Sequence, residues 1–108
     1  MSRVAIPIAF ILALLATEPA ADTQVEQGRL VFTREAQPSC SICHTLADAG
    51  SSGLIGPNLD ELKPSADRVR NAVTGGVAVM PPFAGILSQE QIDAVARYVA
   101  KVTGGENP

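Results

Sequence analysis

The chain has 108 residues, 46% of them hydrophobic and only 18% charged, with a formal net charge of −3. A chain of this length is expected to form one small domain. Eight Lys and Arg residues against eleven Asp and Glu residues exclude a nucleic-acid-binding protein and a polybasic membrane-surface binder, because too little positive charge is present to pair with phosphates. The high apolar fraction and the low net charge exclude an intrinsically disordered chain.

Residues 1–21 have the layout of a secretory signal peptide: a basic start, a short apolar run, and a small or polar close. The alternative is a retained membrane anchor. Against it, Glu18 and two prolines interrupt a stretch that would need about 20 apolar residues to span a bilayer. We therefore predict export to the periplasm, cleavage after Ala21 or Ala16, a mature domain over 22–108, and no stable membrane insertion after cleavage.

The first helix is expected to run from about Thr23 to Arg34, because Thr23 and Glu26 have the spacing of an N-terminal capping box. The stretch 36–59 that follows is expected to be mostly irregular, apart from one helical turn. A mature chain this short buries only about 60–65% of its unfolded surface. It therefore needs a disulfide, a metal or a large cofactor to hold it together.

That stretch contains Cys40-Ser41-Ile42-Cys43-His44, which holds both cysteines of the chain. A thioredoxin-like redox pair would need a βαβ frame, a zinc site would need four ligands, and a disulfide between these cysteines would close only a tiny loop. C-x-x-C-H is instead the motif of covalent haem c attachment, in which both thiols add to the haem vinyl groups and the imidazole lies beneath the iron. We predict one haem c attached to Cys40 and Cys43, with His44 as an iron ligand.

A middle helix is expected to begin near Ser65 and to stop at Gly75-Gly76. The loop after it contains Met80, followed by two prolines that stiffen the backbone. Haem iron takes His, Cys, Met or Tyr from proteins. After cleavage one histidine and one methionine remain, both cysteines are used in attachment, and Tyr98 lies in a predicted helix. Met80 is therefore the predicted second iron ligand; the alternative is a methionine that fills the core.

The last helix is expected to start after Ser88, which forms a capping box with Gln91, and to end at Gly104-Gly105. Between these ends, apolar residues recur at helical spacing. No strand is expected anywhere in the chain. The predicted fold class is therefore all-α, with three main helices around one covalently attached haem c.

These motifs, in this order, resemble the class I c-type cytochromes, and in particular their small bacterial periplasmic monohaem members, over essentially the whole mature chain. Gly28 and Phe32 resemble the family's first-helix pair, in which the glycine permits a close crossing with the last helix. Tyr98 resembles its aromatic partner, and Met80-Pro81-Pro82-Phe83 resembles the loop of the methionine ligand. Taken singly, Phe32 and Tyr98 are equally well explained as core residues.

Gly56-Pro57-Asn58-Leu59 resembles the family's segment after the haem motif, whose proline carbonyl accepts a hydrogen bond from Nδ1–H of the proximal histidine. The resemblance implies this role for Pro57, which would fix the tautomer of His44 and so belongs to the cofactor site. Without the resemblance, Gly56-Pro57 is simply a turn.

An iron ligated by both His44 and Met80 has no open position, so it can pass one electron but does not readily bind a substrate. We therefore predict a monomeric periplasmic electron carrier, not an enzyme, that exchanges electrons with partner proteins. The alternative is a haem c electron-transfer subunit of a larger periplasmic oxidoreductase complex. A third candidate, a haem enzyme or gas sensor with a labile Met80, would bind carbon monoxide or cyanide when reduced.

The segments expected around the haem, 36–47, 49–59 and 75–89, contain no Asp, Glu, Lys or Arg. We expect a neutral haem edge that docks partners through a small apolar patch with weak electrostatic steering. The residues expected near that patch are Ile42, Val79, Pro81 and Pro82. The candidates to line the haem pocket are Ile42, Leu46, Leu54, Leu59, Val69, Val73, Val79, Phe83, Ile86 and Leu87.

Overall fold

The structure is a computed structural model and describes residues 21–106 together with positions 3 and 5. The predicted signal segment therefore lies almost entirely outside the described residues, and so does its apolar run. Among the helices that the structure describes, none is both long enough and apolar enough to cross a membrane.

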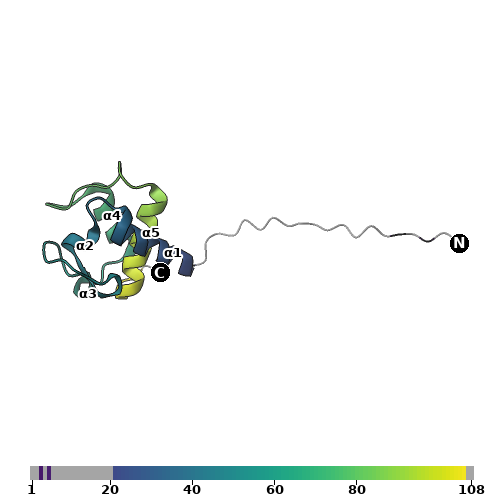
Figure 1. The fold of residues 1–108 in the computed structure, drawn as a ribbon, viewed down its shortest axis with the longest axis horizontal. Coiled ribbons are helices and arrows are strands. Elements are labelled where there is room, and N and C mark those ends of the chain that lie inside the picture. Colours follow the sequence, from purple (N-terminus) through teal and green to yellow (C-terminus); the bar gives the residue numbers. More distant parts are fainter. Residues whose placement is uncertain (1–2, 4, 6–20, 107–108) are drawn as a thin grey trace.

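Helices dominate the described part of the chain, as predicted (Figure 1). In chain order they are α1 (Ala21–Leu30), its π-helical continuation η1 (Val31–Glu35), α2 (Cys40–Cys43), the 3-10 turn η2 (Ala47–Ala49), α3 (Leu59–Leu62), α4 (Ala66–Gly75) and α5 (Gln89–Thr103). The three longest are the three main helices predicted from the sequence.

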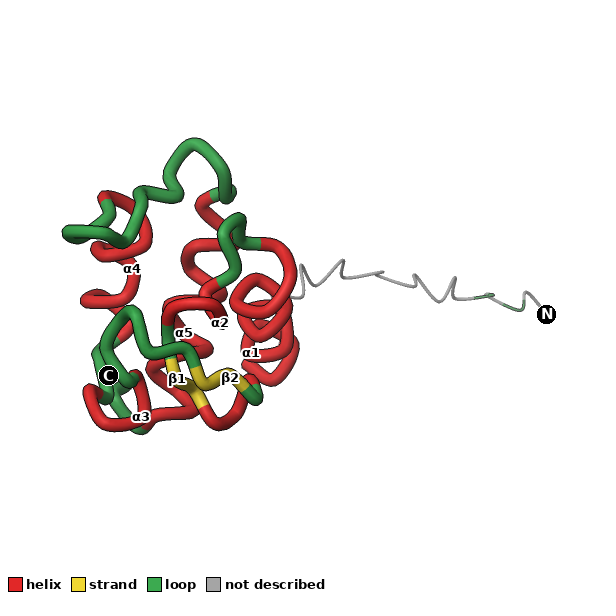
Figure 2. The backbone as a smooth tube through the Cα atoms, turned by 60° about the vertical axis from the view of Figure 1, so that its left-hand side comes forward, coloured by secondary structure: helices red, strands yellow, loops and turns green. Residues whose placement is uncertain are grey.

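The expectation of no strand is wrong. Thr45–Leu46 (β1) and Ser51–Ser52 (β2) form a small antiparallel hairpin in which Thr45 lies opposite Ser52 and Leu46 opposite Ser51. Figure 2 shows it next to α2 and α3. Two residues per strand are too few for an alternating pattern to be visible in the sequence.

The N-terminal cap predicted for the first helix is also wrong. The helix already begins at Ala21, so Thr23 lies inside it, and Glu26 forms an ion pair with Arg29 instead of closing a capping box. The short helix α3 was not predicted. It is capped by Asn58, whose side chain accepts hydrogen bonds from the backbone N–H groups of Asp60 and Glu61.

The caps predicted for the two later helices are confirmed. The Ser65 hydroxyl accepts from the N–H of Arg68 at the start of α4. At the start of α5, Ser88 accepts from the N–H of Gln91, and the Gln91 side chain accepts from the N–H of Ser88. Gly104, in the left-handed conformation, ends α5.

The core is centred on the crossing of α1 and α5 (Figure 1). Gly28 makes this crossing close, because a Cβ atom built there would lie 2.3 Å from the Ala94 carbonyl oxygen and 2.3 Å from Cβ of Tyr98. One turn on, the Phe32 ring meets the Tyr98 ring edge-to-face, with centroids 6.0 Å apart. Both rings are almost fully buried. The geometry matches the helix pair that the family resemblance implied.

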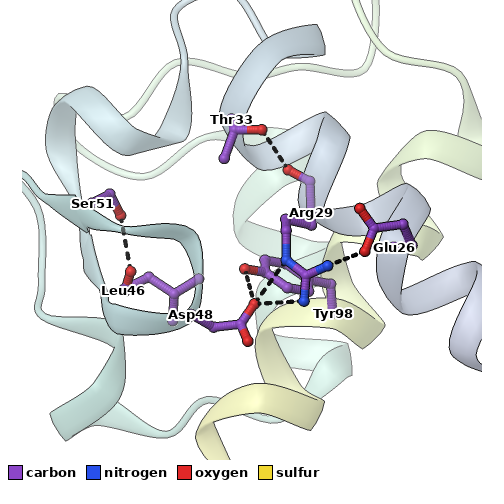
Figure 3. A network of polar contacts seen from close by, with 7 residues as sticks. All are labelled: Glu26, Arg29, Thr33, Leu46, Asp48, Ser51 and Tyr98. Atoms are coloured by element: carbon purple, nitrogen blue, oxygen red, sulfur yellow. Dashed lines mark hydrogen bonds and ion pairs between the residues drawn. The ribbon is translucent and has the colours of Figure 1, made fainter.

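A polar network ties the hairpin region to these two helices (Figure 3). The Asp48 carboxylate, in η2, accepts a hydrogen bond of 2.6 Å from the Tyr98 hydroxyl and one of 3.0 Å from Nε of Arg29. Burial, and then the bond to Asp48, raise the pKa of Tyr98, so the hydroxyl remains a donor. The segment that directly follows the cysteine motif is thereby fixed to α1 and α5.

Replacing Gly28 with alanine tests the close crossing. The new methyl group would overlap backbone atoms of α5, so the two helices would have to separate, at an expected cost of about 1–3 kcal/mol in the free energy of unfolding. Denaturant unfolding of the haem-loaded protein measures this. Gly75→Ala is the matched control, because a Cβ there meets no atom within 4 Å. Equal stability of the two variants would contradict the role given to Gly28.

Candidate functional site

A cavity of about 480 Å³ opens beside α2, within the range of roughly 300–1,000 Å³ typical of cofactor sites. Its walls come from η1, α2, α3, α4 and α5, and from the loops at 55–57 and 77–83. The five residues predicted for the cofactor site all line it: Cys40, Cys43, His44, Pro57 and Met80. Sequence positions up to 40 residues apart thus meet around one space.

The His44 imidazole is held by the segment 56–57. Its Nδ1 lies 2.7 Å from the Pro57 carbonyl oxygen, a distance at which a protonated Nδ1 donates to that oxygen. Gly56 packs against the same ring, since a Cβ there would lie 2.7 Å from Cε1 of His44. The Gly56 N–H in turn donates to the Cys43 carbonyl at 2.7 Å. This arrangement leaves Nε2 of His44 free to bind a metal.

The two cysteines lie at the ends of the single helical turn α2. Ser39 caps this turn: its hydroxyl accepts from the N–H of Ser41 and donates to the Phe32 carbonyl, so α2 is tied to the end of the first helix. Both thiols are free and partly buried. Burial raises the pKa of Cys40 to about 11, so it is a neutral thiol at neutral pH.

The loop that carries Met80 is fixed by backbone contacts in addition to its two prolines. Val77 and Met80 exchange both backbone hydrogen bonds, at 3.0 and 2.9 Å, around a two-residue turn. Ala78 in that turn has φ 52°, in the left-handed region. Gly76 lies against the backbone of the same turn, since its Cβ would come within 2.7 Å of the Met80 carbonyl oxygen. These contacts fix the position from which the methionine side chain extends.

Half of the predicted pocket lining is confirmed: Leu59, Val69, Val73, Val79 and Phe83 line the cavity. The other half is wrong. Leu46 and Leu87 are buried in the core away from it, and Ile42, Leu54 and Ile86 are exposed to solvent. The lining residues that sequence reasoning missed include Phe32, Ile55, Leu62, Val77, Val95 and Val99. Val95 and Val99 were visible in the sequence as the apolar stripe of the last helix.

Comparison with known proteins identifies the family. A family model described as "Cytochrome C oxidase, cbb3-type, subunit III" matches residues 23–99. The chain belongs to the class I c-type cytochromes. It is 34% identical over 95 residues to cytochrome c6 of Rippkaea orientalis, a match that covers 81% of this chain and 78% of the relative. It is also similar to the crystal structure of the c-type cytochrome SorU from Sinorhizobium meliloti, at 48% identity and a TM-score of 0.74. That match covers 81% of this cytochrome and 99% of SorU.

Cytochromes of this family bind haem c covalently, and the cavity fits that group. It has an almost entirely apolar wall, two free thiols at one side, and an imidazole whose Nε2 is unused. Covalent attachment of haem c at Cys40 and Cys43 would bring a large apolar body into contact with the buried faces of α4 and α5. This supplies the additional stabilisation that so short a chain requires.

Replacing Gly56 with alanine tests how the imidazole is positioned. The methyl group would overlap the His44 ring, which cannot turn aside without losing its bond to Pro57. We expect a loss of about 1–3 kcal/mol in the unfolding free energy of the haem-loaded protein and altered paramagnetic NMR shifts of the His44 ring. Gly85→Ala is the control, since a Cβ there meets no atom within 4 Å. Unchanged His44 shifts in the Gly56 variant would contradict this account.

Proposed function

We propose that this cytochrome is a periplasmic one-electron carrier in which His44 and Met80 are the two axial ligands of the haem iron. The observation that carries the proposal is the convergence of His44, Met80 and both thiols on one apolar cavity. The bond between Nδ1 of His44 and the Pro57 carbonyl supports it further, because it leaves Nε2 as the only nitrogen free for a metal.

The bound haem c supplies an iron that takes up and releases one electron. The residues of this chain control that reaction in three ways. Pro57 holds the His44 ring in one tautomer and one orientation. The Met80 thioether favours the reduced iron and so raises the potential. The apolar wall, from Phe32 to Val99, excludes water and raises the potential further. With His44 and Met80 both holding the iron, no position would remain for a substrate, so we propose no enzymatic activity.

The periplasmic location rests on the amino-terminal sequence. Residues 1–21 have the layout of a cleaved signal peptide, which makes 22–108 the mature cytochrome domain.

A subunit role is the second candidate, because the matching family model is described as a subunit of an oxidase. The free carrier is favoured by the extent of the match to SorU, since this cytochrome covers 99% of a solved c-type cytochrome chain.

Gel filtration of a gently prepared periplasmic extract, followed by the visible absorption of the haem, separates the two candidates. A free carrier elutes at the size of one small domain, which is the result we expect. Elution with a larger protein would make this chain an electron-transfer subunit. The same column run with the purified cytochrome gives the reference position.

Partner docking is proposed to use the neutral, apolar side chains around the cavity mouth. Val79 is 83% exposed at the tip of the methionine loop although its side chain also lines the cavity, and Ile42 is 59% exposed beside the second cysteine. Leu54, at 90%, is the most exposed large apolar residue described. The one ionised group between Ala36 and Leu59, Asp48, is paired with Arg29. We therefore propose a docking surface of low charge.

The rate of electron transfer from the natural donor should therefore change little with ionic strength. Charges that lie farther than about 10 Å from a contact are screened at roughly 0.1 M salt, so a neutral patch leaves little for salt to weaken. Stopped-flow rates between low and physiological salt measure this. Val79→Lys is the positive control, because it places a charge within the patch and should introduce a salt dependence. A steep dependence in the unmodified protein would refute neutral docking.

A further inference from the structure

Two short segments lie side by side next to the haem motif. Residues 44–47 lead away from the second cysteine and contain β1, and residues 57–60 lead into α3. β1 and α3 are in contact (Figure 2). Leu46 in the first segment and Leu59 in the second are buried in the same hydrophobic core. Apolar packing brings the two segments together but does not by itself fix their register, because it is non-directional.

A hydrogen bond joins the first residues of the two segments, and another joins their last residues. At the first residues, Nδ1 of His44 lies 2.7 Å from the Pro57 carbonyl oxygen. At the last residues, the Ala47 N–H donates to the Asp60 carboxylate at 2.8 Å. Both pairs are 13 positions apart in the chain. The bond at Asp60 therefore holds the segments in the register that the bond at His44 requires.

The local structure favours this contact of Asp60. Its backbone is fixed by Asn58, whose side chain accepts from the N–H of Asp60 at 3.0 Å. The Ala47 N–H needs an acceptor because it opens the turn η2, and the residue before it, Leu46, has no polar side chain with which to cap that turn. A bond from a backbone N–H to a carboxylate is stronger than one between neutral groups. Asp60 thus caps η2 from a distant position in the sequence.

We propose that Asp60 is a positioning residue for His44, the proposed iron ligand. It acts through the backbone, because it holds 57–60 against 44–47 and so keeps the Pro57 carbonyl at hydrogen-bond distance from Nδ1 of the imidazole. The ring orientation is then set from both ends of the paired segments. The proposal rests on His44 as an iron ligand, but not on Met80 or on the carrier role.

Removing the Asp60 carboxylate should let the bond between His44 and Pro57 open more often. The Nδ1 proton exchanges with solvent only when that bond opens, so its exchange rate reports on the open fraction. In haem-loaded Asp60→Ala we expect several-fold faster exchange of this proton, as for the loss of one supporting hydrogen bond, and altered paramagnetic NMR shifts of the His44 ring. Asp60→Asn keeps an acceptor oxygen, so both values should stay close to those of the natural protein.

Two comparisons separate positioning from effects of charge and of overall stability. Glu61→Ala removes the same charge from the next residue, which is exposed and whose backbone N–H, the group that Asn58 binds, stays in place. Exchange of the Val99 backbone N–H, in the buried part of α5, measures opening of the core in every variant. Normal haem absorption in each variant shows that the haem is attached.

The results have distinct meanings. Faster Nδ1 exchange and altered ring shifts in Asp60→Ala, with natural values in Asp60→Asn and Glu61→Ala, support the proposal. Natural values in Asp60→Ala overturn it. An equal change in Asp60→Asn or Glu61→Ala also overturns it, because loss of charge would then be the cause. Equal acceleration at Val99 overturns it as well, because Asp60 would then stabilise the whole fold.

Failure of the ligand assignment gives a different result, which is visible without any substitution. A natural protein that shows no paramagnetically shifted signals from the His44 ring overturns the assignment of His44 as an iron ligand, and the positioning role of Asp60 with it.

Discussion

The position of one imidazole ring is the constraint on which the site depends. His44 follows directly on a single turn of helix, and a turn that short does not fix a side chain by itself. The ring is held from the opposite side by Gly56, which leaves room for it, and by Pro57, which accepts its Nδ1–H. The backbone between them is closed by the bond from the Gly56 N–H to the Cys43 carbonyl. The orientation of the His44 ring is therefore set by main-chain atoms.

The network around Asp48 holds this arrangement in place relative to the helices. Asp48 lies in the hairpin region that joins His44 to Gly56, and its carboxylate is bound by Tyr98 on α5 and by Arg29 on α1 (Figure 3). The close crossing at Gly28 brings those two helices together. The core contact between α1 and α5 and the placement of the cofactor motif are thus one connected structure. The ion pair with Arg29 also neutralises Asp48, the one acidic residue in the segment 36–59.

Features coded by neighbouring residues could be predicted from the sequence. The caps at Ser65 and Ser88 depend on side chains three residues from their partners, and the haem motif is contiguous. The first-helix cap at Thr23 failed because the helix extends further toward the N-terminus. Features decided by distant contacts were missed. The hairpin at 45–52 is too short to show a pattern and depends on contacts with Tyr98, 50 positions away from Asp48.

The residues that line the cavity show the same difference between features set by neighbouring residues and features set by distant contacts. Leu54 was expected to face the haem, but it is 90% exposed, and its neighbour Ile55 lines the cavity instead. Likewise Ile86 is exposed and Leu87 is buried in the core. Both pairs lie in loops, where no regular period relates a position to a direction. On the helix α4, by contrast, both expected lining residues, Val69 and Val73, line the cavity.

We have proposed that the side chains of His44 and Met80 would both hold the haem iron, so that the site passes electrons and binds no other ligand. Titration of the reduced, haem-loaded protein with carbon monoxide at neutral pH tests it most directly. If Met80 holds the second position, the visible spectrum of the natural protein stays unchanged, whereas Met80→Ala binds one carbon monoxide per haem. Stoichiometric binding by the natural protein would contradict this proposal, because it would show that Met80 does not hold the second position.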